Sequence, residues 1–105
     1  MSAVRYIFNT HGTYVAYVEN NNIFTADNRW YGFLNQGNLV YQKTGKFVGY
    51  LRDDDRIVKK KNEPPRPRLY PPVEPLPLSR PVRPSRQSPM TRLPPPYEDV
   101  FEKAT

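Results

Sequence analysis

One pattern, repeated three times between residues 7 and 51, constrains what this chain can fold into. Each copy opens on an aliphatic and an aromatic residue and has glycine or asparagine four residues after the aromatic. A large aromatic, a small residue and a closing aromatic–aliphatic pair follow. The copies are 16 and then 17 residues apart. Self-similarity at a regular spacing indicates a repeat architecture, so we expect three equivalent structural units.

Each copy has the features of a short β-hairpin. Gly12, Asn28 and Gly45 occupy the same place in the three copies, and both residue types tolerate the positive φ that tight turns require. The segments that follow are apolar on both faces, which is typical of strands covered on both sides. Polar clusters join one copy to the next, as turns do. The sequence therefore predicts a run of short antiparallel strands.

A small residue, Ala16, Gly32 or Gly49, recurs at one place in the second strand of each copy. In a strand, such a residue usually marks a bulge or the close approach of another backbone. Equivalent positions crowd one another around a symmetry axis. We therefore expect these three residues to face such an axis.

A fourth copy begins but is not completed. Ile57 and Val58 repeat the opening pair, and Asn62 stands at the turn position. Prolines follow where the second strand should be, and proline cannot donate to a β ladder. The fourth copy is therefore predicted to be a strand and a turn that lead out of the fold.

The composition changes near residue 62. All 13 prolines lie in residues 64–96, and all five glycines lie before residue 50. We predict a β-repeat domain over residues 1–62, a proline-rich tail over residues 63–96 and an aromatic-acidic terminal peptide over residues 97–105. The tail cannot bury enough apolar surface to offset its ordering entropy, so we expect it to be extended, polyproline II-like and disordered.

The repeated unit resembles that of the four-fold beta flower domain proteins, a family of small bacterial proteins. The resemblance rests on residues 7–18, on the two further copies, and on the order of repeat, proline-rich tail and aromatic-acidic end. It implies an all-β fold in which four short antiparallel hairpins surround a pseudo-four-fold axis, as a small barrel or flower. It supplies no activity, cofactor or catalytic residue. Because the fourth copy is incomplete, three sources of closure stay open: residues 1–6, part of the tail, or a second chain.

The sequence offers little for catalysis. The chain has no cysteine, and His11, its only histidine, lies in a predicted turn and is interpreted as a turn residue. The acidic run at residues 53–55 and the basic run at residues 59–61 are interpreted as a solvated loop and a solvated edge. We therefore expect no enzymatic activity, no cofactor and no metal site.

The charge and hydropathy patterns limit location and partners. The formal net charge of +6 is spread along the chain, so a dense basic patch for nucleic acid is missing. No apolar stretch is long enough for a signal core or a membrane span. We expect a cytoplasmic protein that does not contact a membrane.

The tail holds the best candidates for binding. Tyr97, Val100 and Phe101 lie at i, i+3 and i+4, so one helical turn would place them on one face as a terminal docking peptide. A proline–arginine stretch upstream has the form of a polyproline II ligand. We predict a non-enzymatic interaction module that engages an unknown protein partner or a second copy of itself. The candidate partner-binding residues are Tyr97, Val100, Phe101, Pro81, Pro84 and Arg86.

The alternative is a small nucleic-acid-binding β-barrel that stacks bases on aromatic residues beside basic ones. Arg29 precedes Trp30 and Lys46 precedes Phe47, which makes these four residues the candidate contacts. Equivalent positions of a symmetric repeat usually fill one core layer. We therefore favour a core role for the post-turn aromatics, of which Tyr14 is the third.

Overall fold

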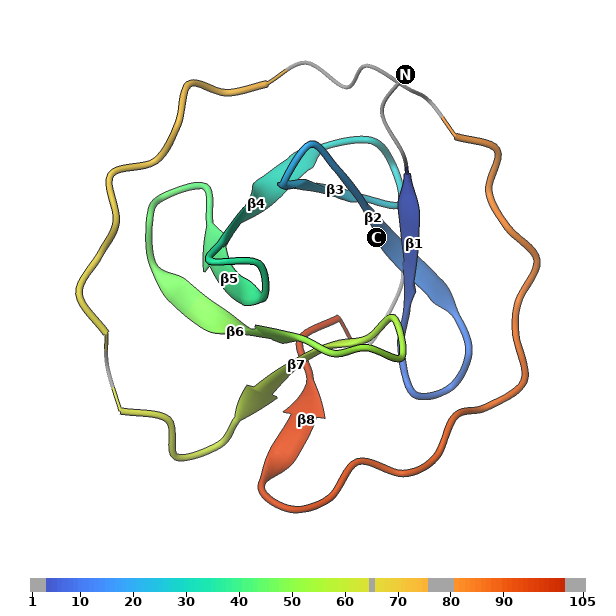
Figure 1. The fold of residues 1–105 in the computed structure, drawn as a ribbon. Coiled ribbons are helices and arrows are strands. Elements are labelled where there is room, and N and C mark those ends of the chain that lie inside the picture. The colour runs from blue at the N-terminus through green and yellow to red at the C-terminus, as the bar shows by residue number, and fades with distance from the viewer. Residues whose placement is uncertain (1–3, 65, 76–80, 102–105) are drawn as a thin grey trace.

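The structure is a computed structural model that describes residues 4–64, 66–75 and 81–101. Eight antiparallel strands form one sheet in sequence order, and the sheet curls into a half-barrel (Figure 1). The strands are β1 (Arg5–Phe8), β2 (Tyr14–Glu19), β3 (Asn22–Thr25), β4 (Trp30–Asn35), β5 (Leu39–Gln42), β6 (Phe47–Leu51), β7 (Ile57–Lys60) and β8 (Tyr97–Asp99). No helix occurs in these described ranges. The predicted all-β class is confirmed.

The predicted turns are present in the first three hairpins. The turn residue has a positive φ in each, 84° at Gly12, 68° at Asn28 and 91° at Gly45. Its N–H donates to the carbonyl three residues earlier, at 3.0, 2.9 and 2.8 Å. The same local geometry therefore recurs with the sequence repeat.

A β-bulge recurs at one place in these three hairpins. The strand register shifts at Ile7/Phe8, Ile23/Phe24 and Val40/Tyr41. Each shift leaves one residue of the second strand unpaired, and its carbonyl can bond to the next hairpin. The Ala26 N–H donates to the Val15 carbonyl at 3.0 Å, and the Lys43 N–H donates to the Tyr31 carbonyl at 2.9 Å. Bulges bend strands, so three in register curve the sheet around a common centre (Figure 1).

Two apolar layers follow from the alternation along the strands. The inner cluster consists mainly of aliphatic residues from the first strand, the bulge and the end of the second strand of successive hairpins. A second, aromatic cluster packs around the first hairpin. β2 is buried along its whole length, whereas β4 and β6 are only partly buried. Coverage on both faces, which was predicted for all three second strands, is therefore complete in β2 alone. The inner cluster contains Ile7, Val15, Ala16, Val18, Ile23, Val40, Leu51, Ile57 and Phe101, with Tyr31, Leu34, Val48 and Val100 packed against it.

The recurrent small residues are crowded by a neighbouring strand. A Cβ on Gly32 would lie 1.9 Å from the Tyr41 carbonyl oxygen, and one on Gly49 would lie 2.1 Å from that of Val58. Both carbonyls belong to the opening strand of the next hairpin. The predicted close approach of another backbone is confirmed. The expected cause, crowding at an axis, is wrong at these two glycines, because the adjacent strand already occupies the space.

The tail differs from the disordered segment that the sequence predicts. Residues 66–75 and 81–96 run around the outside of the strands and are called the belt (Figure 1). We call the β-repeat domain of residues 1–62 the head. Docking an extended proline-rich chain on it costs little conformational entropy, and carbonyls of the head turns are available as acceptors. Three belt amides donate to head carbonyls: Leu69 to Gly45 at 3.0 Å, Gln87 to Gly12 at 2.9 Å and Met90 to Thr10 at 2.8 Å.

Candidate interaction site

The fourth hairpin is completed by the end of the chain. In the β7–β8 ladder Val58 lies opposite Asp99, Lys59 opposite Glu98 and Lys60 opposite Tyr97. The Val100 N–H donates to the Ile57 carbonyl at 3.0 Å and extends this pairing. We call residues 97–101 the closing segment. Of the three sources of closure left open by the sequence, the structure uses the chain after residue 62, in its aromatic-acidic terminal peptide, so the sheet does not end at the predicted domain boundary.

Phe101 anchors the closing segment in the inner core. It is 8% exposed, and its ring packs edge-on against Tyr31 with the centroids 4.8 Å apart. Tyr31 belongs to the second hairpin, so the closing segment reaches across the molecule. The helical turn expected for Tyr97, Val100 and Phe101 is wrong, because the unpaired edge of β7 offers this peptide a ladder.

A seam separates the fourth hairpin from the first. The Thr10 N–H donates to Asp99 Oδ2 at 3.1 Å, and the Phe8 N–H donates to the Asp55 carbonyl at 2.9 Å. The Arg5 Nε donates to Asp55 Oδ1 at 2.6 Å. β1 is paired with β2 but with no other strand of the described chain. Single hydrogen bonds and an ion pair therefore close the ring where a ladder is missing.

Arg56, directly before β7, contacts the β6–β7 turn, the first hairpin and the belt, which meet at this seam. Its side chain is 2% exposed and donates to Thr10 Oγ1 at 3.1 Å and to the Thr91 carbonyl at 2.7 Å. Its Nε and Nη2 both donate to Asp54 Oδ2, the Nε at 3.1 Å. The hydrogen bond from Arg56 holds the pKa of the Asp54 carboxyl below its usual range. A buried guanidinium is stable only when its donors are paired, and these partners satisfy it.

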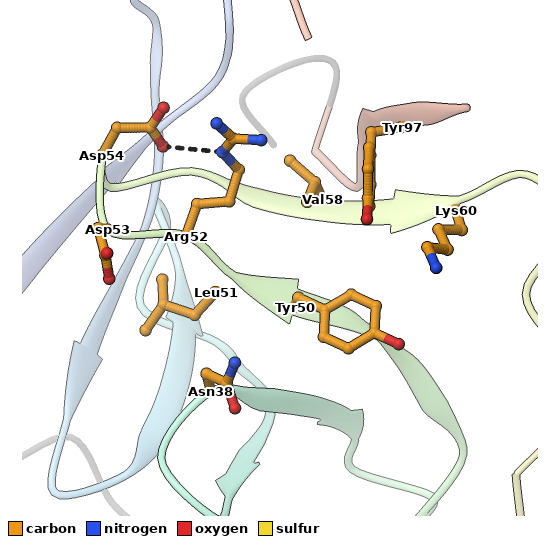
Figure 2. Close-up of a pocket in the computed structure, with 9 residues that line it drawn as sticks. All are labelled: Asn38, Tyr50, Leu51, Arg52, Asp53, Asp54, Val58, Lys60 and Tyr97. Carbon is orange, nitrogen blue, oxygen red and sulfur yellow. Dashed lines mark ion pairs between the residues drawn. The ribbon is translucent and has the colours of Figure 1, made fainter. Parts of the chain in front are cut away.

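An open groove of about 610 Å³ lies over β6, β7 and β8. Figure 2 shows two tyrosines and a lysine at one end and an arginine with two aspartates at the other. The Lys60 Nζ lies 5.8 Å from the centroid of the Tyr97 ring. The volume is within the range of ligand sites, and the lining combines apolar surface with charges of both signs. The lining residues are Asn38, Tyr50, Leu51, Arg52, Asp53, Asp54, Val58, Lys60 and Tyr97.

Tyr97 also lines a second hollow, of about 490 Å³, together with His11, Arg92 and other residues near the seam. All three residues of β8 are half-buried, whereas β2 is buried throughout. The closing segment is thus bordered by two hollows, and its last strand is less covered than β2. Its attachment depends on the β7 ladder, on the Asp99 bond and on Phe101.

The remaining predicted partner-binding residues lie in the belt. Pro81 and Pro84 are half-buried, and Arg86 is exposed. The Arg86 Nη2 donates to the His11 carbonyl at 3.3 Å. The six candidates therefore fall into two separate places, with Tyr97, Val100 and Phe101 in the closing segment and the other three on the outer face.

Of the four candidate nucleic-acid contacts, Phe47 is covered by the belt. The Arg66 guanidinium carbon lies 4.6 Å from the centroid of the Phe47 ring. A base could stack on that face only after the belt moves away. The candidates themselves are Trp30 and Phe47, which are half-buried, and Arg29 and Lys46, which are exposed. The core role expected for the post-turn aromatics holds in full for Tyr14, which is 5% exposed.

Sequence reasoning missed the residues that close the ring. Arg56 and Asp99 find their partners in the first hairpin turn, far away in the chain, and no local spacing marks them. Arg66 and Arg83 contact aromatic rings of the head, but every arginine of a proline–arginine tract looks alike in the sequence. A repeated arginine-to-aromatic pairing becomes visible only in three dimensions.

Within the part of the chain that the structure describes, no group of three or more His, Cys, Asp or Glu side chains is arranged to hold a metal ion. The acidic run at residues 53–55 lies in the turn between β6 and β7. A helix long and apolar enough to cross a membrane is likewise not found among the described residues.

Four antiparallel hairpins that follow one another around a common centre, with a bulge repeated in three of them, define a small flower-like all-β protein. A family model described as 4-fold beta flower protein matches residues 4–101, and the chain belongs to this family. The matched region includes the belt and the closing segment. No curated protein and no solved structure matches the chain.

Proposed function

We propose that this protein is a non-enzymatic assembly module, in which the closing segment of one copy completes the fourth hairpin of another. The observation that supports this is the position of Phe101, an inner-core residue at the far end of the long connection formed by residues 61–96. In the other hairpins, short turns join the two strands. A core element on a long tether is suited to exchange between identical chains.

The reach of the connection permits such an exchange. Residues 61–96 in a polyproline II conformation span about 110 Å, at about 3.1 Å a residue. The molecule is 36 Å across in its longest dimension. The closing segment of one copy therefore reaches the β7 edge of a neighbour once the belt is released. Because the exchanged contacts are identical, concentration decides between the closed monomer and the assembled form.

Refolding at different protein concentrations tests this function. The full chain is refolded from denaturant at low and at high concentration, and the solution mass of each product is measured by light scattering. We expect monomers from dilute refolding, where the tethered segment outcompetes other copies, and dimers or larger assemblies from concentrated refolding.

A Phe101→Ala chain is the matched control, because it keeps the belt but lacks the anchor. It is expected to give fewer assemblies at the same high concentration. Monomers alone from the unmodified chain at every concentration would contradict the proposal. No observation favours the nucleic-acid alternative, and the expected cytoplasmic location stays a prediction from the sequence.

A further inference from the structure

The belt contacts the third hairpin in two ways. The Leu69 N–H donates to the Gly45 carbonyl at 3.0 Å. Three residues earlier, the Arg66 guanidinium covers the ring of Phe47, with its carbon 4.6 Å from the ring centroid. Phe47 follows Gly45 by two positions, so one turn and its post-turn aromatic make both contacts.

The first hairpin repeats this arrangement with a different part of the belt. The Gln87 N–H donates to the Gly12 carbonyl at 2.9 Å. Four residues earlier, the Arg83 guanidinium carbon lies 5.6 Å from the centroid of the Tyr14 ring. Leu69 and Gln87 are chemically unlike, yet they meet equivalent positions of the repeat. The turn geometry of the repeat and the preceding arginine, Arg66 or Arg83, therefore determine where the belt binds, and the side chain of the donating residue does not.

Both turns need glycine for a second reason besides their positive φ. A Cβ on Gly45 would lie 2.0 Å from the Leu69 carbonyl oxygen, and one on Gly12 would lie 2.1 Å from that of Gln87. The belt backbone occupies the space of a side chain. Gly37 also has a positive φ, 89°, but nothing lies within 4 Å of its Cβ position. Among these three glycines of positive φ, close backbone approach is found at the two whose turns contact the belt.

We propose that the pairs Gly12/Tyr14 and Gly45/Phe47 are two copies of one peptide-docking site, which binds an extended segment rich in proline and arginine. The site accepts a hydrogen bond from a backbone amide at the turn carbonyl and binds a preceding arginine on the aromatic ring. A polyproline II chain suits it, since such a chain is already extended and loses little entropy on docking. Cation–π contact selects arginine.

The chain's own belt occupies both sites in the structure, so a segment of the same chemistry from another chain has to compete with it. The inference goes beyond the assembly function, because neither site includes the closing segment. An experiment that contradicts the assembly function would therefore not contradict the peptide-docking site, and the reverse also holds.

Trypsin cleavage tests the two sites separately. The Arg68–Leu69 bond adjoins the third-hairpin site and the Arg86–Gln87 bond adjoins the first, and neither is followed by proline, which blocks trypsin. In the full chain, Gly45→Ala is expected to raise the initial cleavage rate at Arg68–Leu69 by about tenfold, the change expected from losing a hydrogen bond and a cation–π contact. Cleavage at Arg86–Gln87 should change much less.

Gly12→Ala is expected to give the opposite pattern. The Gly37→Ala chain is the matched control, because it has the same backbone strain but no belt contact. It should leave both cleavage rates unchanged. Equal rates in Gly45→Ala, Gly12→Ala and Gly37→Ala would overturn the proposal.

A peptide competition on the unmodified chain keeps the test independent of how well the variants fold. The probe is a synthetic peptide of residues 66–75 with Arg68→Gln, which trypsin cannot cut because proline follows Arg66. Increasing peptide should speed cleavage of the chain at Arg68–Leu69. The same peptide with Arg66→Gln as well should have no effect. Equal effects of both peptides, or none from either, would contradict recognition of arginine by this site.

Discussion

Arg56 is the residue on which the seam depends most visibly, since its guanidinium contacts a turn, the first hairpin and the belt. None of this could be predicted from the sequence, where Arg56 is one arginine after three aspartates. The partners Thr10 and Thr91 lie 46 and 35 residues away. By contrast, the turn residues Gly12 and Gly45 could be predicted, because positive φ is a local property of the chain.

Arg56→Met is expected to lower the free energy of unfolding by about 2 kcal/mol, because hydrogen bonds to a buried charged group are lost. Arg52→Met is the control. Arg52 contacts the same Asp54 at 3.4 Å, but its side chain is 36% exposed, so about 0.5 kcal/mol or less is expected. Urea denaturation measures both values. Equal losses in the two variants would show that burial of Arg56 contributes nothing.

Asp54 gives the seam a pH dependence. Its pKa is lower in the folded chain than the ordinary carboxyl value, mainly through the hydrogen bond from Arg56. The associated stability is fully present above the ordinary pKa, near 4, and is lost as the pH falls through the lowered folded value. Asp54→Asn is therefore expected to flatten the loss of stability below about pH 4. Asp53→Asn, a change at an exposed neighbour, is the control. An unchanged acid profile in Asp54→Asn would refute the role of this carboxyl.

At the scale of the element, the three complete hairpins could be predicted because the sequence pattern of each lies within about a dozen consecutive residues. The bulge is only one of two interpretations of the small residues Ala16, Gly32 and Gly49. Its unpaired residues, each one position earlier, look like ordinary strand positions. The spacing of Tyr97, Val100 and Phe101 predicts a helical turn, but the chain forms β8 there. A spacing of i, i+3 and i+4 within five residues is weak evidence, and the free edge of β7 outweighs it.

Gly32→Ala tests the close approach of the hairpins. Its new Cβ would lie 1.9 Å from the Tyr41 carbonyl, so strands β4 and β5 would have to separate. We expect a loss of about 3 kcal/mol in the free energy of unfolding. Gly37→Ala, which meets nothing, is expected to lose only about 1 kcal/mol through its positive φ. A Gly32→Ala chain as stable as Gly37→Ala would contradict the observed crowding.

At the scale of the whole molecule, the sequence predicts a four-unit flower with one incomplete unit, but it does not identify the segment that completes this unit. The deciding contacts, Phe101 with Tyr31 and Asp99 with Thr10, join positions far apart in the chain. Chain order alone cannot tell which distant segment pairs with a free edge. The tail, in turn, was expected to be free because its composition reveals nothing about the turn carbonyls that it meets.

Phe101→Ala is expected to lower the free energy of unfolding by about 3 kcal/mol, the usual cost of removing a buried phenylalanine. Tyr70→Ala removes an aromatic ring of similar size that is 97% exposed, and its effect should be near zero. Chemical denaturation of the two full-length variants gives the comparison. If the two changes cost the same, Phe101 has no part in the core.

The most direct measurement is amide hydrogen exchange at Val100 in the unmodified full chain. In the structure this amide donates to the Ile57 carbonyl, and the amides of Leu34 and Leu51 donate to the carbonyls of Asn21 and Asn38, in the turns directly before β3 and β5. We predict that Val100 exchanges within about tenfold of Leu34 and Leu51, because all three open with the sheet. Exchange at Val100 as fast as at the exposed Tyr70 would show that the closing segment is not part of the flower.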